Sequence, residues 1–121
     1  MRYRVLTQEE LNRYIDEAEP LDVRVLLILM AKHGVSFEQI LSLKWSNLSK
    51  GSPDYLPGLA LDEYDRKAID ELAKRDNIDS DLKMQNTLFK KAGWGIRAWL
   101  RPYGLVPASL AKTYASLKRL A

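Results

Sequence analysis

The chain has 121 residues, enough for one domain with its own hydrophobic core and too few for two. It contains no cysteine, which excludes disulfides, zinc–thiolate sites and thiol catalysis. The formal net charge of +3 conceals an asymmetry, because residues 1–81 hold 11 Lys and Arg against 16 Asp and Glu, whereas residues 82–121 hold 8 Lys and Arg and no acid.

An amphipathic helix is predicted over residues 8–18. Thr7 and Glu10 form a capping box, in which the Thr7 hydroxyl covers a free amide of the first turn and Glu10 reaches back. An apolar i, i+3, i+4 stripe begins at Leu11, so one face of the helix suits a core. The helix should stop before Pro20, because proline disfavours helical geometry in the residue ahead of it.

A central helix is predicted next. It begins at Asp22, and residues 23–32 are apolar on nearly every side, which is typical of a helix covered by others. Gly34 ends it as a C-terminal cap. Its apolar run, residues 25–31, is far shorter than the roughly 20 residues of a membrane span, and the N-terminus lacks the layout of a signal peptide. We therefore expect a soluble, cytoplasmic protein without membrane contact.

A second capping box, formed by Ser36 and Gln39, opens a short helix. We expect its apolar residues to face inward: Phe37, Ile40, Leu41 and Leu43. Residues 45–61 follow, with two Pro, three Ser and two Gly among short apolar pieces. This composition predicts a small hairpin or two short strands.

The second half of the chain predicts four further helices. Asp62 caps the first, about residues 63–75, whose apolar stripe is formed by Tyr64, Ala68, Ile69 and Leu72. The others are predicted at about 83–91, 93–101 and 107–119, with Pro107 suited to the first turn of the last. Residues 1–121 should therefore form a single domain that is mainly α with a small β element.

The residue types alone indicate no active site. His33 is the one histidine, and no carboxylates accompany it at a spacing that would bind a metal. The three tryptophans, Trp45, Trp94 and Trp99, are most simply core or core-edge residues. We expect no metal and no cofactor.

The segment GVSFEQILSLKWSNL, residues 34–48, resembles a stretch near the start of the catalytic domain of the tyrosine recombinases, the phage integrase family. It keeps the family's glycine and most of its apolar positions, and a Lys-Trp pair stands where the family has Arg-Trp. The positions of the first catalytic arginine, a glutamate and an aspartate hold Ser36, Gln39 and Asn47.

The segment PASLAKTYASL, residues 107–117, resembles the family's helix that supplies a histidine and the second catalytic arginine. Those positions hold Ala108 and Ala111. The catalytic lysine of the family's sheet has only a weak counterpart in Lys50, and the nucleophilic tyrosine would lie beyond Ala121. The resemblance implies a tyrosine-recombinase catalytic-domain-like fold that is truncated at the C-terminus.

The missing groups bear directly on activity. In the family, two arginines, a general acid and a tyrosine surround one phosphate, and losing even one such group costs roughly a few kcal/mol of barrier. Because several are absent together, the resemblance implies a protein that is not an enzyme and does not cut or join DNA strands.

The same resemblance implies a regulatory protein of a phage, prophage or other mobile element, with a role in lysogeny. A domain without the family's C-terminal tail should expose an apolar acceptor groove. Such a groove invites a homodimer or a helix of another protein, such as a full-length integrase-like recombinase or repressor.

The basic residues of the last third are the second binding set: Lys83, Lys90, Lys91, Arg97, Arg101, Lys112, Lys118 and Arg119. They could meet an acidic surface of the partner or the acidic half of this chain itself. The alternative function is direct DNA binding, which would be largely non-specific and would weaken steeply with salt. From the sequence these alternatives stay open.

Overall fold

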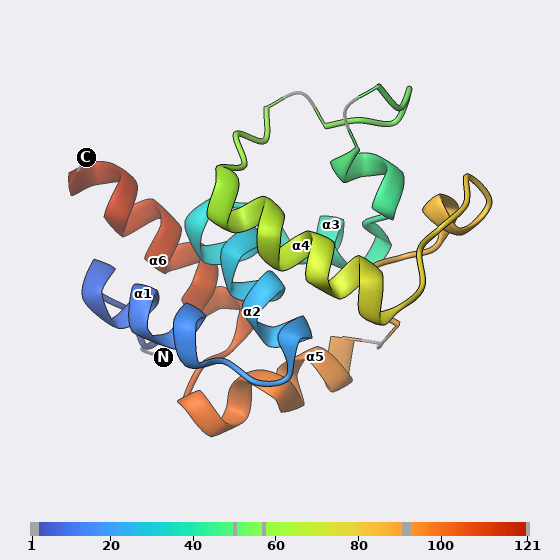
Figure 1. Ribbon diagram of the computed structural model, residues 1–121. Helices are drawn as coiled ribbons and strands as arrows, with labels where there is room; N and C mark the ends of the chain where they lie inside the picture. Colours follow the sequence, from blue (N-terminus) through green and yellow to red (C-terminus); the bar gives the residue numbers. More distant parts are fainter. Residues whose placement is uncertain (1–2, 50, 57, 91–92, 121) are drawn as a thin grey trace.

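The computed structural model describes residues 3–49, 51–56, 58–90 and 93–120. It is mainly helical, as predicted (Figure 1). The elements in chain order are α1 (Gln8–Glu17), α2 (Leu21–Leu27), the π-helix η1 (Ile28–Lys32), α3 (Phe37–Ser42), the 3-10 helix η2 (Trp45–Leu48), α4 (Glu63–Arg75), the 3-10 helix η3 (Lys83–Gln85), α5 (Gly93–Leu100), the 3-10 helix η4 (Arg101–Tyr103) and α6 (Pro107–Leu120).

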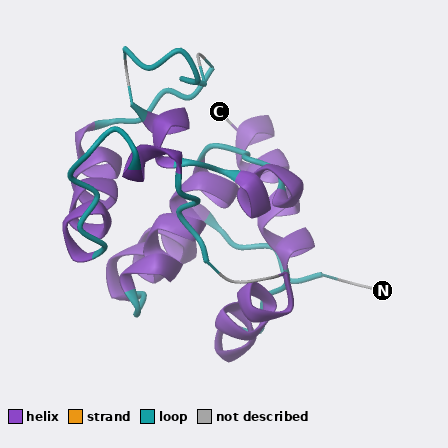
Figure 2. Ribbon diagram, turned by 90° about the vertical axis from the view of Figure 1, so that its right-hand side faces the viewer, coloured by secondary structure: helices purple, strands orange, loops and turns teal. Residues whose placement is uncertain are grey.

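The core is built around the central helix formed by α2 and η1. Residues 25–31 are almost completely excluded from solvent, which confirms the prediction of a covered central helix. Helices α1, α4 and α6 pack around it (Figures 1 and 2). The helix widens at its end, where the amide of His33 donates to the carbonyl of Ile28, five residues back, at 3.2 Å. This π geometry brings Lys32 and His33 to the start of α4.

The N-terminal segment ties the two ends of the chain together. Thr7 and Glu10 form the predicted capping box at the start of α1. Ahead of it, the amide of Leu6 donates to the Thr113 hydroxyl of α6 at 3.0 Å in a buried position. The apolar stripe of α1 is likewise confirmed, with Leu11 and Ile15 buried.

Gly34 is required both for its backbone conformation and for its lack of a side chain. Its φ of +74° lies in the left-handed region, which costs other residues about 1–2 kcal/mol. A Cβ atom here would also lie 2.5 Å from the ring of Tyr114 on α6. The turn between η1 and α3 therefore also forms the surface against which α6 packs.

The predicted β element of residues 45–61 is wrong. Residues 45–48 form the 3-10 helix η2, and no strand occurs in the described residues after it (Figure 2). The side chain of Asn47 satisfies backbone groups that a ladder would otherwise pair. Its Oδ1 accepts from the amide of Lys44 and its Nδ2 donates to the carbonyl of Asp54, both at 2.8 Å.

The predicted helix over 83–91 is also wrong, because only η3 forms within it and Lys91 lies outside the described residues. Residues 86–88 instead run beside 43–45, with an antiparallel bridge between Lys44 and Thr87. The amide of Leu88 donates to the carbonyl of Leu43 at 3.0 Å. Pairing with a distant segment thus replaces local helical bonds.

Some predicted core positions also lie at the surface. Trp94 is 76% exposed, and Leu41 and Tyr64 are 40% and 45% exposed, whereas Trp45 is buried and Trp99 is half-buried. Leu41 and Trp94 lie on the short helices α3 and α5, which offer a buried face to few side chains. Tyr64 lies in the first turn of α4, where its hydroxyl bonds to Asp16 of α1.

We expect Gly34→Ala to lower the free energy of unfolding by more than the 1–2 kcal/mol of the left-handed backbone, because the new Cβ must displace Tyr114. Gly51→Ala is the matched control, since Gly51 also has positive φ, at +90°, and no atom within 4 Å of an added Cβ. Chemical denaturation of both variants measures the difference. Equal losses of stability would contradict the role of Gly34 in the packing of α6.

Candidate functional site

The two segments that carry the family resemblance lie against each other. Gly34 packs against Tyr114, so the N-terminus of α3 meets α6 one turn beyond Ala111. On α3, the Ser36 hydroxyl accepts from the Gln39 amide and Gln39 Oε1 accepts from the Ser36 amide, both at 3.2 Å. This confirms the capping box. The side-chain oxygens of Ser36 and Gln39 are therefore both engaged in capping the start of α3.

The three residues that the resemblance places at catalytic positions, Ser36, Ala108 and Ala111, carry no charge. Ser36 is exposed, Ala108 is half-buried and Ala111 is exposed. A cation does approach from another element, because the guanidinium of Arg97 on α5 lies 5.1 Å from the ring centre of Phe37, next to Ser36. The residue next to Ser36 therefore holds a cation over its aromatic ring.

The basic residues of the last third differ in how they are held. Lys83 forms an ion pair with Asp79 at 3.0 Å and donates to the carbonyl of Asn77, so local chain groups occupy it. Lys112 and Lys118 lie over the rings of Tyr3 and Tyr114, each at 5.7 Å. Lys90, Arg101 and Arg119 are also exposed, and no such ring contact is formed by them within the described residues.

The acidic half of the chain does not neutralise these cations. Across residues 3–49, 51–56, 58–90 and 93–120, no carboxylate lies within ion-pairing distance of the six cations other than Lys83: Lys90, Arg97, Arg101, Lys112, Lys118 and Arg119. Apart from the pair between Asp79 and Lys83, the described ion pairs of the acidic half are internal, for example between Arg75 and Asp22. That contact raises the pKa of Arg75. Six cations thus stay available for an external partner.

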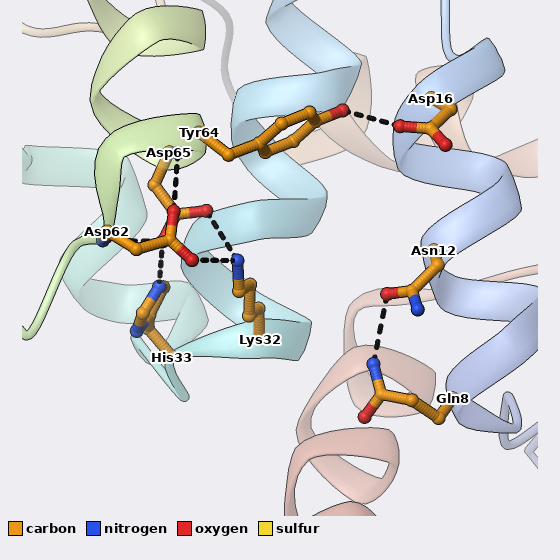
Figure 3. A network of polar contacts seen from close by, with 8 residues as sticks. All are labelled: Gln8, Asn12, Asp16, Lys32, His33, Asp62, Tyr64 and Asp65. Carbon is orange, nitrogen blue, oxygen red and sulfur yellow. Dashed lines mark hydrogen bonds and ion pairs between the residues drawn. The ribbon is translucent and has the colours of Figure 1, made fainter.

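A buried carboxylate joins the central helix to α4 (Figure 3). Asp65 has no exposed side-chain surface, and its two oxygens meet Lys32 Nζ at 2.8 Å and His33 Nε2 at 2.6 Å. Its Oδ2 also accepts from the amide of Asp62 at 3.2 Å. A buried carboxylate is stable only with such partners, so this cluster fixes α4 on the end of the central helix.

The charges of this cluster reinforce one another. The hydrogen bond from Lys32 is the main cause that holds the pKa of Asp62 below its usual value. Burial alone would lower the pKa of Lys32, but its bonds to Asp65 and Asp62 outweigh burial and raise it. Beside the cluster, Tyr64 donates to Asp16 of α1 at 2.6 Å, which raises the pKa of the phenol. One network therefore links α1, α4 and the central helix (Figure 3).

Sequence reasoning missed this cluster because Lys32 and His33 lie more than 30 positions ahead of Asp65. The available signal was local: Asp65 is the N3 residue of a capping box that begins at Asp62, and an acid there favours the helix dipole. Nothing in that pattern marks Asp65 as buried.

A cavity of about 250 Å³ opens beside His33 and is lined by His33, Gly34, Val35, Gln39, Leu56, Gly58 and Leu59. These lining residues carry no hydroxyl, thiol or carboxylate that the imidazole could activate there. No group of three or more His, Cys, Asp or Glu in the described ranges could hold a metal ion. The contacts that the cluster does make join α4 to the central helix.

The chain matches no protein-family model, no curated protein and no solved structure. In the part of the chain that the structure describes, no helix is long and apolar enough to cross a membrane.

We expect Lys32→Met to lower the free energy of unfolding by roughly 3 kcal/mol, because it leaves the Asp65 charge buried with one cationic partner fewer. This value is at the low end for buried pairs, since the Lys32 side chain is 32% exposed. Lys83→Met, which removes an exposed pair with Asp79, should change stability far less, because solvent screens exposed charges. Urea denaturation followed by circular dichroism measures both, and similar losses would contradict the anchoring role of Asp65.

Proposed function

We propose that this protein is a non-catalytic regulator on a tyrosine-recombinase-like scaffold, which acts by binding a partner protein. The partner is a full-length integrase-like recombinase or repressor of the same phage, prophage or mobile element, whose activity the complex switches. The observation that carries the proposal is the junction of α3 and α6. Its packing through Gly34 and Tyr114 is intact, while Ser36, Ala108 and Ala111 supply no group for phosphate chemistry.

The charge distribution supports a binding role. Six cations on α5, on α6 and beside them have no described carboxylate partner, so the last third of the chain keeps its positive potential for an external surface. An acidic partner surface would gain association rate and specificity from this potential.

The same six cations favour DNA binding as the second candidate function. Phosphate contacts made by several Lys and Arg give affinity that falls steeply with salt. The absence of charge at Ser36 and Ala111 argues against this alternative, because those positions would lie nearest to a phosphate at the junction.

A direct comparison of the two functions uses purified protein. We expect a complex with the integrase-like protein encoded by the same element, detected by light scattering after size exclusion, and little mobility shift of DNA at physiological salt. A DNA shift at submicromolar protein that weakens steeply with salt, without a protein complex, would overturn the proposal in favour of DNA binding.

Restoring both arginines tests the scaffold. We expect Ser36→Arg with Ala111→Arg to tighten DNA binding without cleavage, and to steepen the slope of log K against log salt by roughly 2, since two phosphate contacts are added. Losing the Ser36 cap should cost about 1 kcal/mol of stability, so circular dichroism must first show a folded protein.

The matched control for this test is Ala60→Arg with Ser80→Arg, which adds the same charge at two exposed positions outside the junction. If the control tightens DNA binding as much as the junction variant does, the effect is non-specific. The assignment of Ser36 and Ala111 to the two arginine positions would then be wrong.

A further inference from the structure

The largest exposed aromatic side chain in the described residues belongs to α5. Trp94, in the first turn of this helix, is 76% exposed, although tryptophan is among the residues that gain most from burial. On α3, Leu41 is 40% exposed and lies one turn beyond the half-buried Phe37. Two neighbouring helices therefore leave apolar surface in water.

The ring of Phe37 joins the start of α5, where Trp94 lies, to α3, where Leu41 lies. A Cβ atom on Gly93 would lie 3.2 Å from the ring of Phe37, so the start of α5 rests on that ring. Arg97 covers the same ring at 5.1 Å and lies three residues after Trp94, on the same side of α5. We call Phe37, Leu41, Trp94 and Arg97 the α3–α5 surface.

Cations frame this surface along α5. Lys90 is exposed ahead of the helix, Arg97 lies within it and Arg101 is exposed directly after it. No carboxylate of the described residues pairs with any of the three. The one acid on α3 is Glu38, so the charge that the surface presents is mainly positive.

We propose that the α3–α5 surface docks an acidic amphipathic helix of the partner protein. Apolar side chains of that helix cover Trp94 and Leu41, and its Asp and Glu side chains meet Arg97 and the flanking cations. Trp and Arg are the residue types that most often dominate binding energy at the centre of an interface. This inference rests on the proposed function and names the part of the molecule that performs it.

A second copy of this chain fits the surface less well. Its acidic helices are α1 and α4, and most apolar residues of both lie in the core: Leu11 and Ile15 on α1, and Ala68, Ile69 and Leu72 on α4. Tyr64 of α4 is 45% exposed, but its hydroxyl is bonded to Asp16 of α1, so it is a poor anchor for a second copy. A single-stranded nucleic acid could stack on Trp94, but Leu41 offers it no aromatic face.

The test uses a defined probe, a labelled synthetic helix of about five turns, ~18 residues, with Leu at i, i+3, i+4, i+7 spacing and Glu on the flanks. Fluorescence anisotropy measures its affinity for the intact protein. We expect Trp94→Ala to weaken binding by about tenfold or more and Arg97→Ala by several-fold, with chemical shift changes confined to residues 36–42 and 90–101.

The matched control is Leu82→Ala, which removes another apolar side chain, 83% exposed, in the loop after α4. This variant should bind the probe as the unchanged protein does. Equal affinity of Trp94→Ala and Leu82→Ala, or no binding of the probe, would overturn the inference.

Two further probes exclude other occupants. A charge-reversed helix with Lys in place of Glu should bind at least about tenfold more weakly, because like charges then face each other. The assignment of an acidic helix would be wrong if that helix, or a single-stranded oligonucleotide, bound more strongly than the acidic probe. It would also be wrong if the protein formed a dimer that Trp94→Ala abolishes.

The two proposals fail separately. If the native complex forms and Trp94→Ala leaves it unchanged, the docking surface is wrong and the regulatory function stands. If no complex forms although the acidic helix binds, the function is wrong and the surface stands.

Discussion

The fold depends on how the central helix ends. Asp65, with no solvent contact, takes charge-assisted hydrogen bonds from Lys32 and His33, and this holds the start of α4 against the last turn of the helix. The π geometry of η1 carries both donors to that position. A single buried carboxylate thereby fixes how α4 and the central helix lie against each other, since a displacement of either helix would leave the charge unpaired.

The turn that follows the central helix positions α6 and α3. Gly34 adopts a left-handed conformation and leaves room for Tyr114, so α6 can pack onto the turn. Ser36 then caps α3, which positions Phe37 beneath Arg97 of α5. Caps and ring contacts of this kind fix the positions of surface side chains.

Charge divides the chain into two parts with different roles. Several carboxylates of the acidic first part pair with its own Lys and Arg, and the pair between Arg75 and Asp22 joins α4 to α2. The last part has no acid, and apart from Lys83 its described cations remain without a carboxylate. A surface of one sign that is next to exposed Trp94 is suited to recognition, because it combines electrostatic attraction with apolar area that water solvates poorly.

Local signals in the sequence determined the helix starts at Thr7, Ser36 and Asp62, because a cap depends on residues three positions apart. They also marked the central helix and the acid-free third. Only the tertiary structure decided that Asp65 is buried between Lys32 and His33, that residues 86–88 pair with a distant segment, and that Trp94 faces solvent. The reason is physical: caps and periodicity are short-range, whereas burial, strand pairing and ion pairs depend on which distant segments come together.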